Sequence, residues 1–137
     1  KNHMKKIEEN LSGDDEDAFT LAAVEKNTGA IVGYVAGTRS ESDMQRFHIS
    51  QVQVERAHQG RRLGQLMIHA AERRSSKLGW GCKRTSLKVM QRNHAARRCY
   101  EGDDFKISGR SAGATHAKSI DQEGWLVMSR AHRDASV

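Results

Sequence analysis

Two segments in the middle of the chain place residues that could do chemistry at informative spacings. The first runs from Val54 to Gly64 and has the form of a strand end, a glycine-containing turn and the start of a helix. The second follows Leu87-Lys88-Val89 and holds Asn93, Ala96, Tyr100, Glu101 and Phe105. The first segment is suited to holding a phosphate, and the second directs an amide and a phenol at one place.

The turn from Gln59 to Gly64 predicts an anion site. The N-terminus of a helix exposes unpaired N–H groups and carries partial positive charge, and glycines let an anion approach the backbone closely. Arg61 and Arg62 add mobile cations. An ordinary strand-to-helix turn explains these residues equally well when the turn is taken alone. The spacings GxxxxGK[ST] and GxGxxG are both absent, so neither a Walker loop nor a dinucleotide fingerprint is indicated.

The second segment reads as a strand over 85–90 followed by a short helix from Asn93 to about Glu101. Asn93 is a suitable helix cap. Tyr100 has an unperturbed pKa near 10, and its hydroxyl could serve as an acid. The simpler interpretation of Tyr100 is a core aromatic at helical spacing, and the pairing with Asn93 favours the acid.

Charge divides the chain unevenly. The 137 residues carry a net charge of +6, yet 14 of the 23 basic residues and only 4 of the 17 acidic ones lie between positions 56 and 110. A basic region can attract a nucleic acid or a small polyanion with several phosphates, and it can also be a set of solvated helix faces. No apolar run approaches the length of a membrane span. The length predicts one domain over 1–137.

The pattern of apolar residues predicts the following order of elements: a short amphipathic helix over 4–11, an acidic loop over 12–17, a hairpin over 19–25 and 31–37, a strand over 47–54, a helix over 61–78 ended by Gly79, a strand over 85–90, a helix over 93–101, a strand from Phe105, a loop over 108–122 and a last strand over 125–128. In the long helix, Leu63, Met67, Ala70 or Ala71, and Leu78 share one face. Strands and helices alternate after residue 47, which indicates a mixed sheet of the α/β or α+β class.

The strand over 47–54 contains a change of phase. Phe47 and Ile49 are apolar at odd positions, whereas Val52 and Val54 are apolar at even ones. Because side chains alternate along a strand with a period of two, this change requires an extra residue. We expect a β-bulge near Ser50-Gln51; a strand buried on both faces is the alternative.

Cysteine and histidine usage argues against a disulfide framework and against a metal site. Cys82 and Cys99 are too few for a disulfide scaffold, and His58, His69 and His94 lack metal-ligand spacing. We therefore expect no metal cofactor and a reducing, cytoplasmic setting. Cys99 is adjacent to Tyr100 but has no evident partner, which favours a structural role.

With these motifs in view, the chain resembles the GNAT N-acetyltransferases over roughly residues 19 to 130. Gln59, Gly60, Leu63 and Gly64 match the family's Gln/Arg-x-x-Gly-x-Gly turn in its Arg-Gly variant, and Asn93, Ala96, Tyr100, Glu101 and Phe105 match its second motif. Two motifs in the correct order are more specific than either alone. Arg62 and Asp104 stand where the family usually has glycines, which leaves an inactive family member open as an interpretation.

The resemblance implies a GNAT-like, mostly antiparallel mixed sheet with splayed fourth and fifth strands, flanked by helices. It implies that acetyl-CoA is the cosubstrate, with Asn93 at the pantetheine and Tyr100 protonating the departing thiolate. The implied cofactor-binding residues are Val52, Gln53, Val54, Gln59, Gly60, Arg61, Arg62, Leu63, Gly64, Asn93 and Ala96. The family usually begins with a strand and one or two helices that wall the acceptor site, so we expect those elements to be short or missing here.

The reaction also needs a base that takes a proton from the amine. Family members with a catalytic residue on the fourth strand place it about 11 residues before the turn motif, which points to His48. Imidazole titrates in a useful range, and Ser50 would share its face and could relay the proton through water. Glu55 is the second candidate, and the simpler interpretation of His48 is a surface or core histidine.

The sequence therefore predicts an acyl-CoA-dependent N-acyltransferase that moves an acetyl group to the amine of a small molecule or peptide. The alternative is a basic nucleic-acid-binding module in which these residues form a phosphate patch: Arg73, Arg74, Lys83, Arg84, Arg92, Arg97 and Arg98. The patch lacks interleaved aromatic residues for base stacking, which makes nucleic acid the weaker partner. A membrane partner is not expected, and a homodimer is left open.

Overall fold

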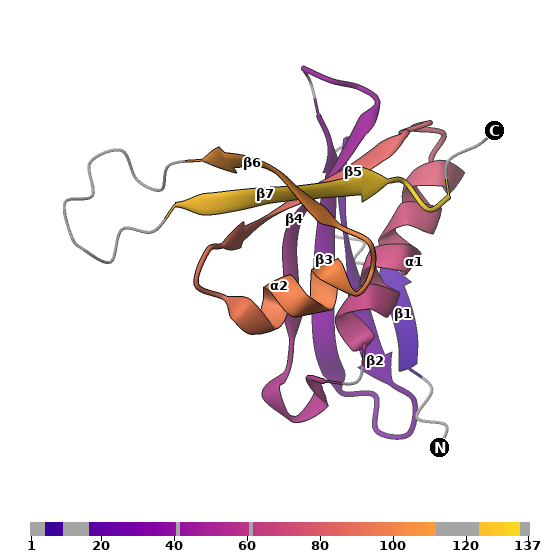
Figure 1. Ribbon diagram of the computed structural model, residues 1–137. Helices are drawn as coiled ribbons and strands as arrows, with labels where there is room; N and C mark the ends of the chain where they lie inside the picture. The colour runs from indigo at the N-terminus through magenta and orange to yellow at the C-terminus, as the bar shows by residue number, and fades with distance from the viewer. Residues whose placement is uncertain (1–4, 10–16, 41, 61, 112–123, 135–137) are drawn as a thin grey trace.

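The computed structural model describes residues 5–9, 17–40, 42–60, 62–111 and 124–134 (Figure 1). The elements are β1 (Lys5–Glu9), β2 (Ala18–Glu25), β3 (Ile31–Arg39), β4 (Arg46–Val54), the 3-10 turn η1 (Arg56–His58), α1 (Leu63–Lys77), β5 (Arg84–Met90), α2 (His94–Glu101), β6 (Lys106–Ser111) and β7 (Trp125–Ala131). Most of the predicted elements are confirmed with ends shifted by a few residues.

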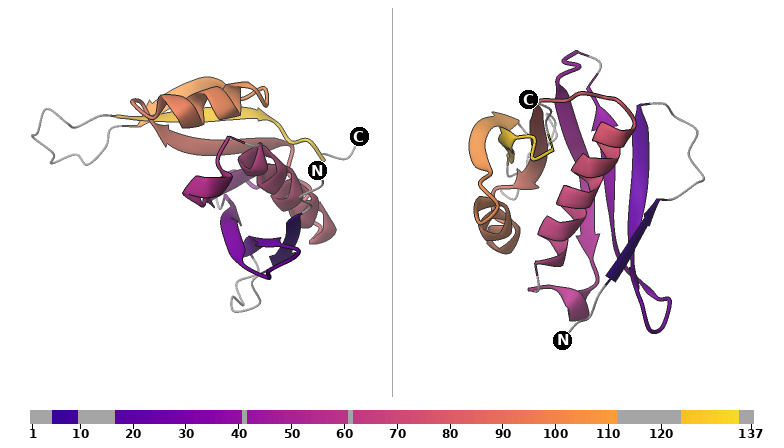
Figure 2. Two further views of the ribbon diagram at one scale, coloured as in Figure 1. Left: turned by 90° about the horizontal axis from the view of Figure 1, so that it is seen from below. Right: turned by 90° about the vertical axis from the view of Figure 1, so that its right-hand side faces the viewer.

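The described strands form one sheet in the order β1-β2-β3-β4-β5-β7-β6. Strands β4 and β5 are parallel, and every other neighbouring pair is antiparallel. In Figure 2, α1 crosses the strands β2 to β4, whereas α2 lies to the side with β6 and β7. The predicted mixed, mostly antiparallel sheet flanked by helices is confirmed.

The segment over 4–11 was predicted as a helix, and this prediction is wrong. Lys5–Glu9 is an edge strand paired with β2, with Ile7 opposite Ala23. A helix of about two turns is marginal in water without tertiary support, whereas the free edge of β2 offers hydrogen bonds to every second residue of this segment. The predicted acidic loop over 12–17 lies almost wholly outside the described residues. The predicted loop over 108–122 is wrong at its start, because β6 continues to Ser111, and the rest of it lies outside the described residues.

The predicted bulge in β4 is confirmed and sits at Ser50. Gln51 is opposite Ala36 and Ile49 is opposite Gly37, so Ser50 is the extra residue between two consecutive pairs. The Ser50 hydroxyl donates to the Ala36 carbonyl (3.3 Å). The parallel pairing of β4 with β5 ends at Ile49 and Leu87, so the two strands separate directly after the bulge.

The core lies between α1 and the sheet. Leu63, Met67, Ala70 and Ala71 of the predicted helix stripe are buried, as expected. The inclusion of Leu78 in the stripe is wrong, because Leu78 is the C-cap residue beyond the last turn and is 42% exposed. Gly79 follows with a φ of 79°, the left-handed conformation that stops a helix at little cost. This helix is therefore fixed along its length against β2 to β4, and its first turn lies at the point where β4 and β5 separate.

Candidate acyl-CoA cleft

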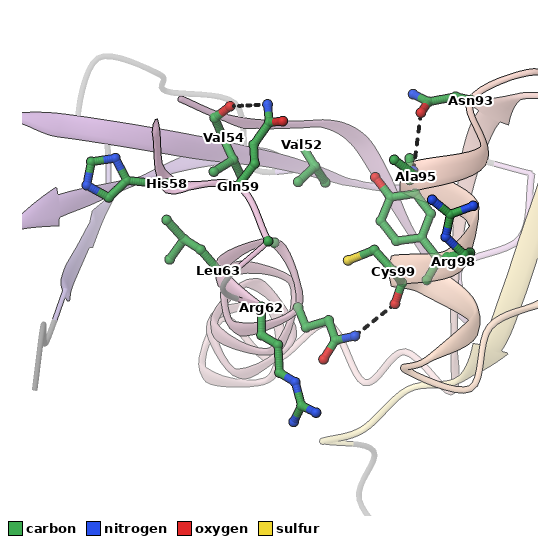
Figure 3. A pocket seen from close by; sticks show the side chains of 15 residues that line it. Val52, Val54, His58, Gln59, Arg62, Leu63, Asn93, Ala95, Arg98 and Cys99 are labelled. Carbon is green, nitrogen blue, oxygen red and sulfur yellow. Dashed lines mark hydrogen bonds between the residues drawn. The ribbon is translucent and has the colours of Figure 1, made fainter. Parts of the chain in front are cut away.

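A cleft of about 580 Å³ opens where β4 leaves β5. Its lining residues come from the end of β4, the turn into α1 and one face of α2: Val52, Val54, His58, Gln59, Gly60, Arg62, Leu63, Gly64, Gln65, Asn93, Ala95, Ala96, Arg98, Cys99 and Tyr100. Figure 3 shows Val52, Val54 and Leu63 on one side and Asn93, Ala95 and Cys99 on the other. The structure thus brings the two sequence motifs together around one space.

The strand side of the cleft combines apolar side chains with backbone that β5 does not pair. Val52 and Val54 are half-buried and line the cleft. Gln53 points to the opposite face, as alternation along a strand requires, and its side chain is exposed and outside the lining. Gln53 could therefore contact a ligand here only through its backbone.

The turn between β4 and α1 has the geometry of an anion site. Gln59 Nε2 donates to the Val54 carbonyl (2.9 Å), which folds the turn against the strand end. Gly60 has a φ of 81°. Helix α1 begins at Leu63 with no side-chain cap, so the N–H groups of its first turn lack intrahelical partners and are available to an anion. Arg61 lies outside the described residues.

Arg62 and Asp104 stand where glycines were expected, and both have the left-handed backbone conformation that glycine favours. Among the described non-glycine residues, Arg62 (φ 61°) and Asp104 (φ 70°) are the ones with positive φ. A side chain in this region is sterically unfavourable. The Arg62 side chain extends away from Val52 and Val54 in Figure 3, and Asp104 Oδ2 accepts a hydrogen bond from Arg133 Nη2 (2.5 Å). The turn is therefore retained despite both substitutions.

Helix α2 supplies the second wall. Asn93 caps the helix as predicted, because its Oδ1 accepts from the Ala96 N–H (3.2 Å). Since this bond uses only the carbonyl side of the amide, the NH₂ group keeps its donors for a ligand. Ala96 and Tyr100 follow on the same helix face, at spacings of three and four residues.

Tyr100 lies in the wall of the cleft with an altered acidity. Burial, and to a smaller extent the neighbouring Cys99, raises the pKa of its hydroxyl to about 12. Its ring meets the Phe105 ring edge-on, with centroids 6.0 Å apart. Tyr100 is thus protonated throughout the physiological range and oriented by a core aromatic residue.

A hydrogen bond joins the two helices beneath the cleft. Gln65 Nε2, from the first turn of α1, donates to the Cys99 carbonyl of α2 (2.8 Å). Burial raises the pKa of the Cys99 thiol, which keeps it protonated and unreactive. Gln65, His58, Ala95 and Arg98 line the cleft although the sequence motifs did not single them out as ligand residues. None of them lies three or four residues from Gly64 or Ala96 on a helix, so helical spacing gave no signal for them.

The two candidate bases lie outside the lining of the cleft. His48 is on β4 before the bulge, opposite Ser86 of β5, and its Nδ1 is 3.0 Å from Ser86 Oγ. It alternates with buried Phe47 and Ile49, so it faces the other side of the sheet. Burial lowers its pKa, and Arg46 and Lys88 lower it further. A neutral imidazole at neutral pH is the form that accepts a proton.

Glu55 and Ser50 have other partners in this structure. Glu55 Oε1 accepts from His58 Nδ1 (2.9 Å), and the Glu55 side chain is about half exposed. The Ser50 hydroxyl is directed to the Ala36 carbonyl. Of the three residues considered for proton transfer, His48 is the one whose ring is held by β5 at the point where the strands separate.

The cleft therefore joins a helix start for an anion, an unpaired strand edge, an apolar strip and a protonated phenol. A long ligand with phosphate at one end and an amide-containing arm fits this series.

Within the described parts of the chain, no group of three or more His, Cys, Asp and Glu side chains could hold a metal ion. No helix among those residues is long and apolar enough to cross a membrane.

Comparisons with known proteins identify the family and the fold of the chain. The model of the acetyltransferase (GNAT) family matches residues 2–104. A nourseothricin acetyltransferase structure superposes with a TM-score of 0.74 at 23% identity, covering 90% of this chain and 70% of that chain. A Klebsiella pneumoniae structure named as a putative acyl-CoA N-acyltransferase gives a TM-score of 0.71 at 19% identity, covering 96% of this chain and 99% of that chain.

A third similar structure was solved with a bound acetyl coenzyme A. This Bacillus anthracis structure, named as a putative streptothricin acetyltransferase in complex with acetyl coenzyme A, gives a TM-score of 0.73 at 15% identity and covers 86% of this chain and 64% of that chain. At these identities the likeness shows a common fold. No curated protein sequence matches the chain.

Proposed function

The chain belongs to the GNAT family of acetyltransferases, and we propose that it transfers the acetyl group of acetyl-CoA to a primary amine by direct attack on the thioester. The observation that carries this function is the cleft between β4 and α2, in which the turn into α1 and Tyr100 line the same space. The basic nucleic-acid module is the weaker candidate, because the family and the cleft both favour a small phosphorylated cosubstrate.

In the proposed complex, acetyl-CoA lies along β4 with its pyrophosphate at the uncapped start of α1. The pantetheine amides pair with the backbone of Val52 to Val54, beyond the last β4–β5 pair. The Asn93 NH₂ group donates to the pantetheine. The left-handed backbone at Arg62 and Asp104 supports an active protein, because both turns keep their shape without glycine.

The chemical step forms a C–N bond and breaks the C–S bond of the thioester. The neutral amine attacks the carbonyl carbon, and a backbone N–H of β4 stabilises the oxyanion. The amine proton leaves to a base, for which His48 is the proposed group, acting directly or through water. The electron pair of the C–S bond goes to sulfur as the thiolate departs.

Tyr100 is the proposed donor to that sulfur. Its pKa of about 12 exceeds that of an ordinary thiol, about 8.5. A complete proton transfer from Tyr100 to the thiolate is therefore uphill, and the phenol contributes mainly as a hydrogen-bond donor while charge develops. The thiolate then takes its final proton from solvent or through Tyr100.

Acceptor screening tests the function directly. Purified protein is mixed with acetyl-CoA and one amine from a panel of aminoglycosides, polyamines, amino sugars, peptide N-termini and lysine peptides, and release of free thiol is followed with a colorimetric reagent. Acetylation of the amine is verified by mass spectrometry. Thiol release that depends on one class of amine is the expected result, and binding of acetyl-CoA without transfer to any amine would favour the inactive family member.

The free thiols Cys82 and Cys99 support the proposed cytoplasmic setting.

A further inference from the structure

A cluster of buried charges lies behind the cleft, between α1, β7 and the turn that follows α2. Glu72 is fully buried, and the side chains of Arg130 and Asp103 are 4% and 5% exposed. Charges at this depth persist only when they are paired and fully hydrogen-bonded. Sequence patterns did not indicate this cluster, although Glu72 falls on the buried face of α1 four residues after Ile68.

The Arg130 guanidinium is hydrogen-bonded by three different parts of the fold. Nη1 donates to Glu72 Oε2 (2.6 Å) and to the Ala131 carbonyl (2.8 Å), and Nη2 donates to Glu72 Oε1 (3.2 Å). Nη2 also donates to Asp103 Oδ2 (3.0 Å), and Nε donates to the Asp103 carbonyl (2.8 Å). All three guanidinium nitrogens are therefore engaged, in a planar geometry that an ammonium group cannot reproduce.

Arg130 is connected to the cleft through Phe105. Its Cζ lies 4.4 Å from the centroid of the Phe105 ring, and the Phe105 ring packs edge-on against Tyr100. The backbone makes the same link, because the N–H groups of Asp103 (2.9 Å) and Phe105 (3.0 Å) both donate to the Tyr100 carbonyl. Arg130 thus contacts both residues that hold the end of α2.

Glu72 fixes the other end of this connection. Its Oε2 accepts from Thr85 Oγ1 (2.5 Å) on β5 and from the Arg133 N–H (3.2 Å) after β7. Glu72 is part of α1, whose first turn forms the anion site. The network of hydrogen bonds therefore connects α1, which carries the proposed anion site, to the end of α2, which carries Tyr100.

We infer that Arg130 is a positioning residue: by joining Glu72 of α1 to Asp103 and Phe105 after α2, it sets the Tyr100 hydroxyl at its place in the cleft. This inference rests on the proposed function, in which Tyr100 donates to the departing sulfur. A buried ion pair adds little net stability over an apolar replacement, whereas a small displacement of a reacting group costs a large factor in rate.

The position of Tyr100 can be read without any acetyl transfer. The chain has two tyrosines, Tyr34 and Tyr100, so ¹³C-labelled tyrosine rings give two resolvable sets of signals. In Arg130→Lys, which keeps the charge but loses the planar geometry, the Tyr100 signals should move or broaden while those of Tyr34 stay. If Arg130→Lys does not fold, the same signals are measured in Asp103→Asn, which removes the charge that pairs with Arg130. Unchanged Tyr100 signals in the folded variant would overturn the inference.

A kinetic cycle separates positioning from general loss of stability. Phe105→Leu removes the ring between Arg130 and Tyr100, and Phe19→Leu is the matched control, since Phe19 is equally a buried core aromatic and packs on Phe47 and Trp80. We expect kcat to fall about tenfold or more in Phe105→Leu, with the Kd for acetyl-CoA within about threefold because the groups placed at CoA are untouched. Phe19→Leu should keep kcat within about twofold at a similar loss of thermal stability.

The same cycle distinguishes this inference from the proposed function. In a Tyr100→Phe background, Phe105→Leu should change kcat by less than about twofold, because the hydroxyl that it positions is gone. If the effects of Phe105→Leu and Tyr100→Phe on kcat were additive, or if Phe105→Leu and Phe19→Leu lowered kcat equally, the positioning of Tyr100 by Arg130 through Phe105 would be overturned. Acetyl transfer itself would not be in question. A Tyr100→Phe variant with full activity would instead count against the role of Tyr100 in the proposed function.

Discussion

At the scale of single residues, the proposed acid and the proposed base lie in environments that change their acidity. Burial keeps Tyr100 protonated with a pKa of about 12, and it lowers the pKa of His48 so that its imidazole is neutral near pH 7. One group is thereby held as a donor and the other as an acceptor. Environments that separate two titrating groups in this way are typical of acid–base pairs.

Tyr100→Phe should lower kcat about tenfold or more and leave the Kd for acetyl-CoA nearly unchanged. In the proposed mechanism the hydroxyl interacts with sulfur only as the thiolate forms, so its loss weakens binding of the transition state and not of the ground state. Steady-state kinetics and calorimetry on the same preparation measure the two effects. A kcat within about twofold of the parent would remove Tyr100 from the chemical step.

His48→Gln should remove the acidic limb of the pH profile of kcat/KM. Because the pKa of His48 is lowered from 6.5, the parent limb should lie below pH 6.5, with activity lost as the pH falls and the imidazole becomes charged. Ser86→Ala, which removes the hydroxyl beside His48 Nδ1, should shift that limb but keep it. If His48→Gln retains the parent's limb, the base is Glu55 or bulk solvent.

At the scale of elements, the bulge at Ser50 and the turn into α1 create the cleft. The bulge ends the β4–β5 pairing, and the turn places an uncapped helix start beside the free strand. Arg62 precedes this helix in a left-handed conformation, with a φ of 61°. A non-glycine residue there stores strain of about 1 kcal/mol or more.

Arg62→Gly should therefore raise the stability of the protein. Relief of the strain is partly offset by the greater flexibility of glycine in the unfolded chain, so we expect a net gain of up to about 1 kcal/mol and a higher Tm. Asp104→Gly is the matched comparison, and it should gain less because it also loses the bond to Arg133. Thermal unfolding by circular dichroism measures both. A lower Tm in Arg62→Gly would show that the arginine side chain outweighs the backbone strain.

The elements near the site were predictable because local rules govern them. The phase change between Ile49 and Val52 located the bulge, and Asn93 located the start of α2. The edge strand Lys5–Glu9 was not predictable, because its pairing with β2 is a tertiary contact that overrides local preference. The partnership of Glu72, Asp103 and Arg130 joins residues far apart in the chain, and a charged residue on a helix gives no local sign of being buried.

At the scale of the whole molecule, burial of neutral histidines couples folding to pH. His132 Nδ1 accepts from the Asp134 N–H (3.1 Å), and its Nε2 is 2.9 Å from the buried Ser75 hydroxyl. Burial lowers its pKa, as it does for His48. Protonation of Nδ1 would remove an acceptor that the fold uses.

Stability should fall as the pH drops below about 6.5. In that range the unfolded chain binds protons at both histidines and the folded chain does not, so each contributes a slope of at most about 1.4 kcal/mol per pH unit. Urea unfolding at a series of pH values measures the slope. The double variant His48→Gln/His132→Gln should flatten the curve between the lowered pKa values and 6.5; an unchanged slope would assign the dependence to other groups.

The central claim is that acetyl-CoA lies in the cleft with its pyrophosphate at the start of α1, and calorimetric titration of acetyl-CoA into Gly64 variants tests it most directly. A Cβ added at Gly64 would lie 3.8 Å from Cys99 Sγ and 3.9 Å from Val52 Cγ1, which are ordinary van der Waals contacts. Gly64→Asp places a negative charge at the anion site, and Gly64→Asn is the uncharged control of the same size. We predict that Gly64→Asp weakens binding at least about tenfold more than Gly64→Asn, with the difference shrinking at high salt. Equal affinities of the two folded variants for acetyl-CoA would contradict this placement of the cosubstrate.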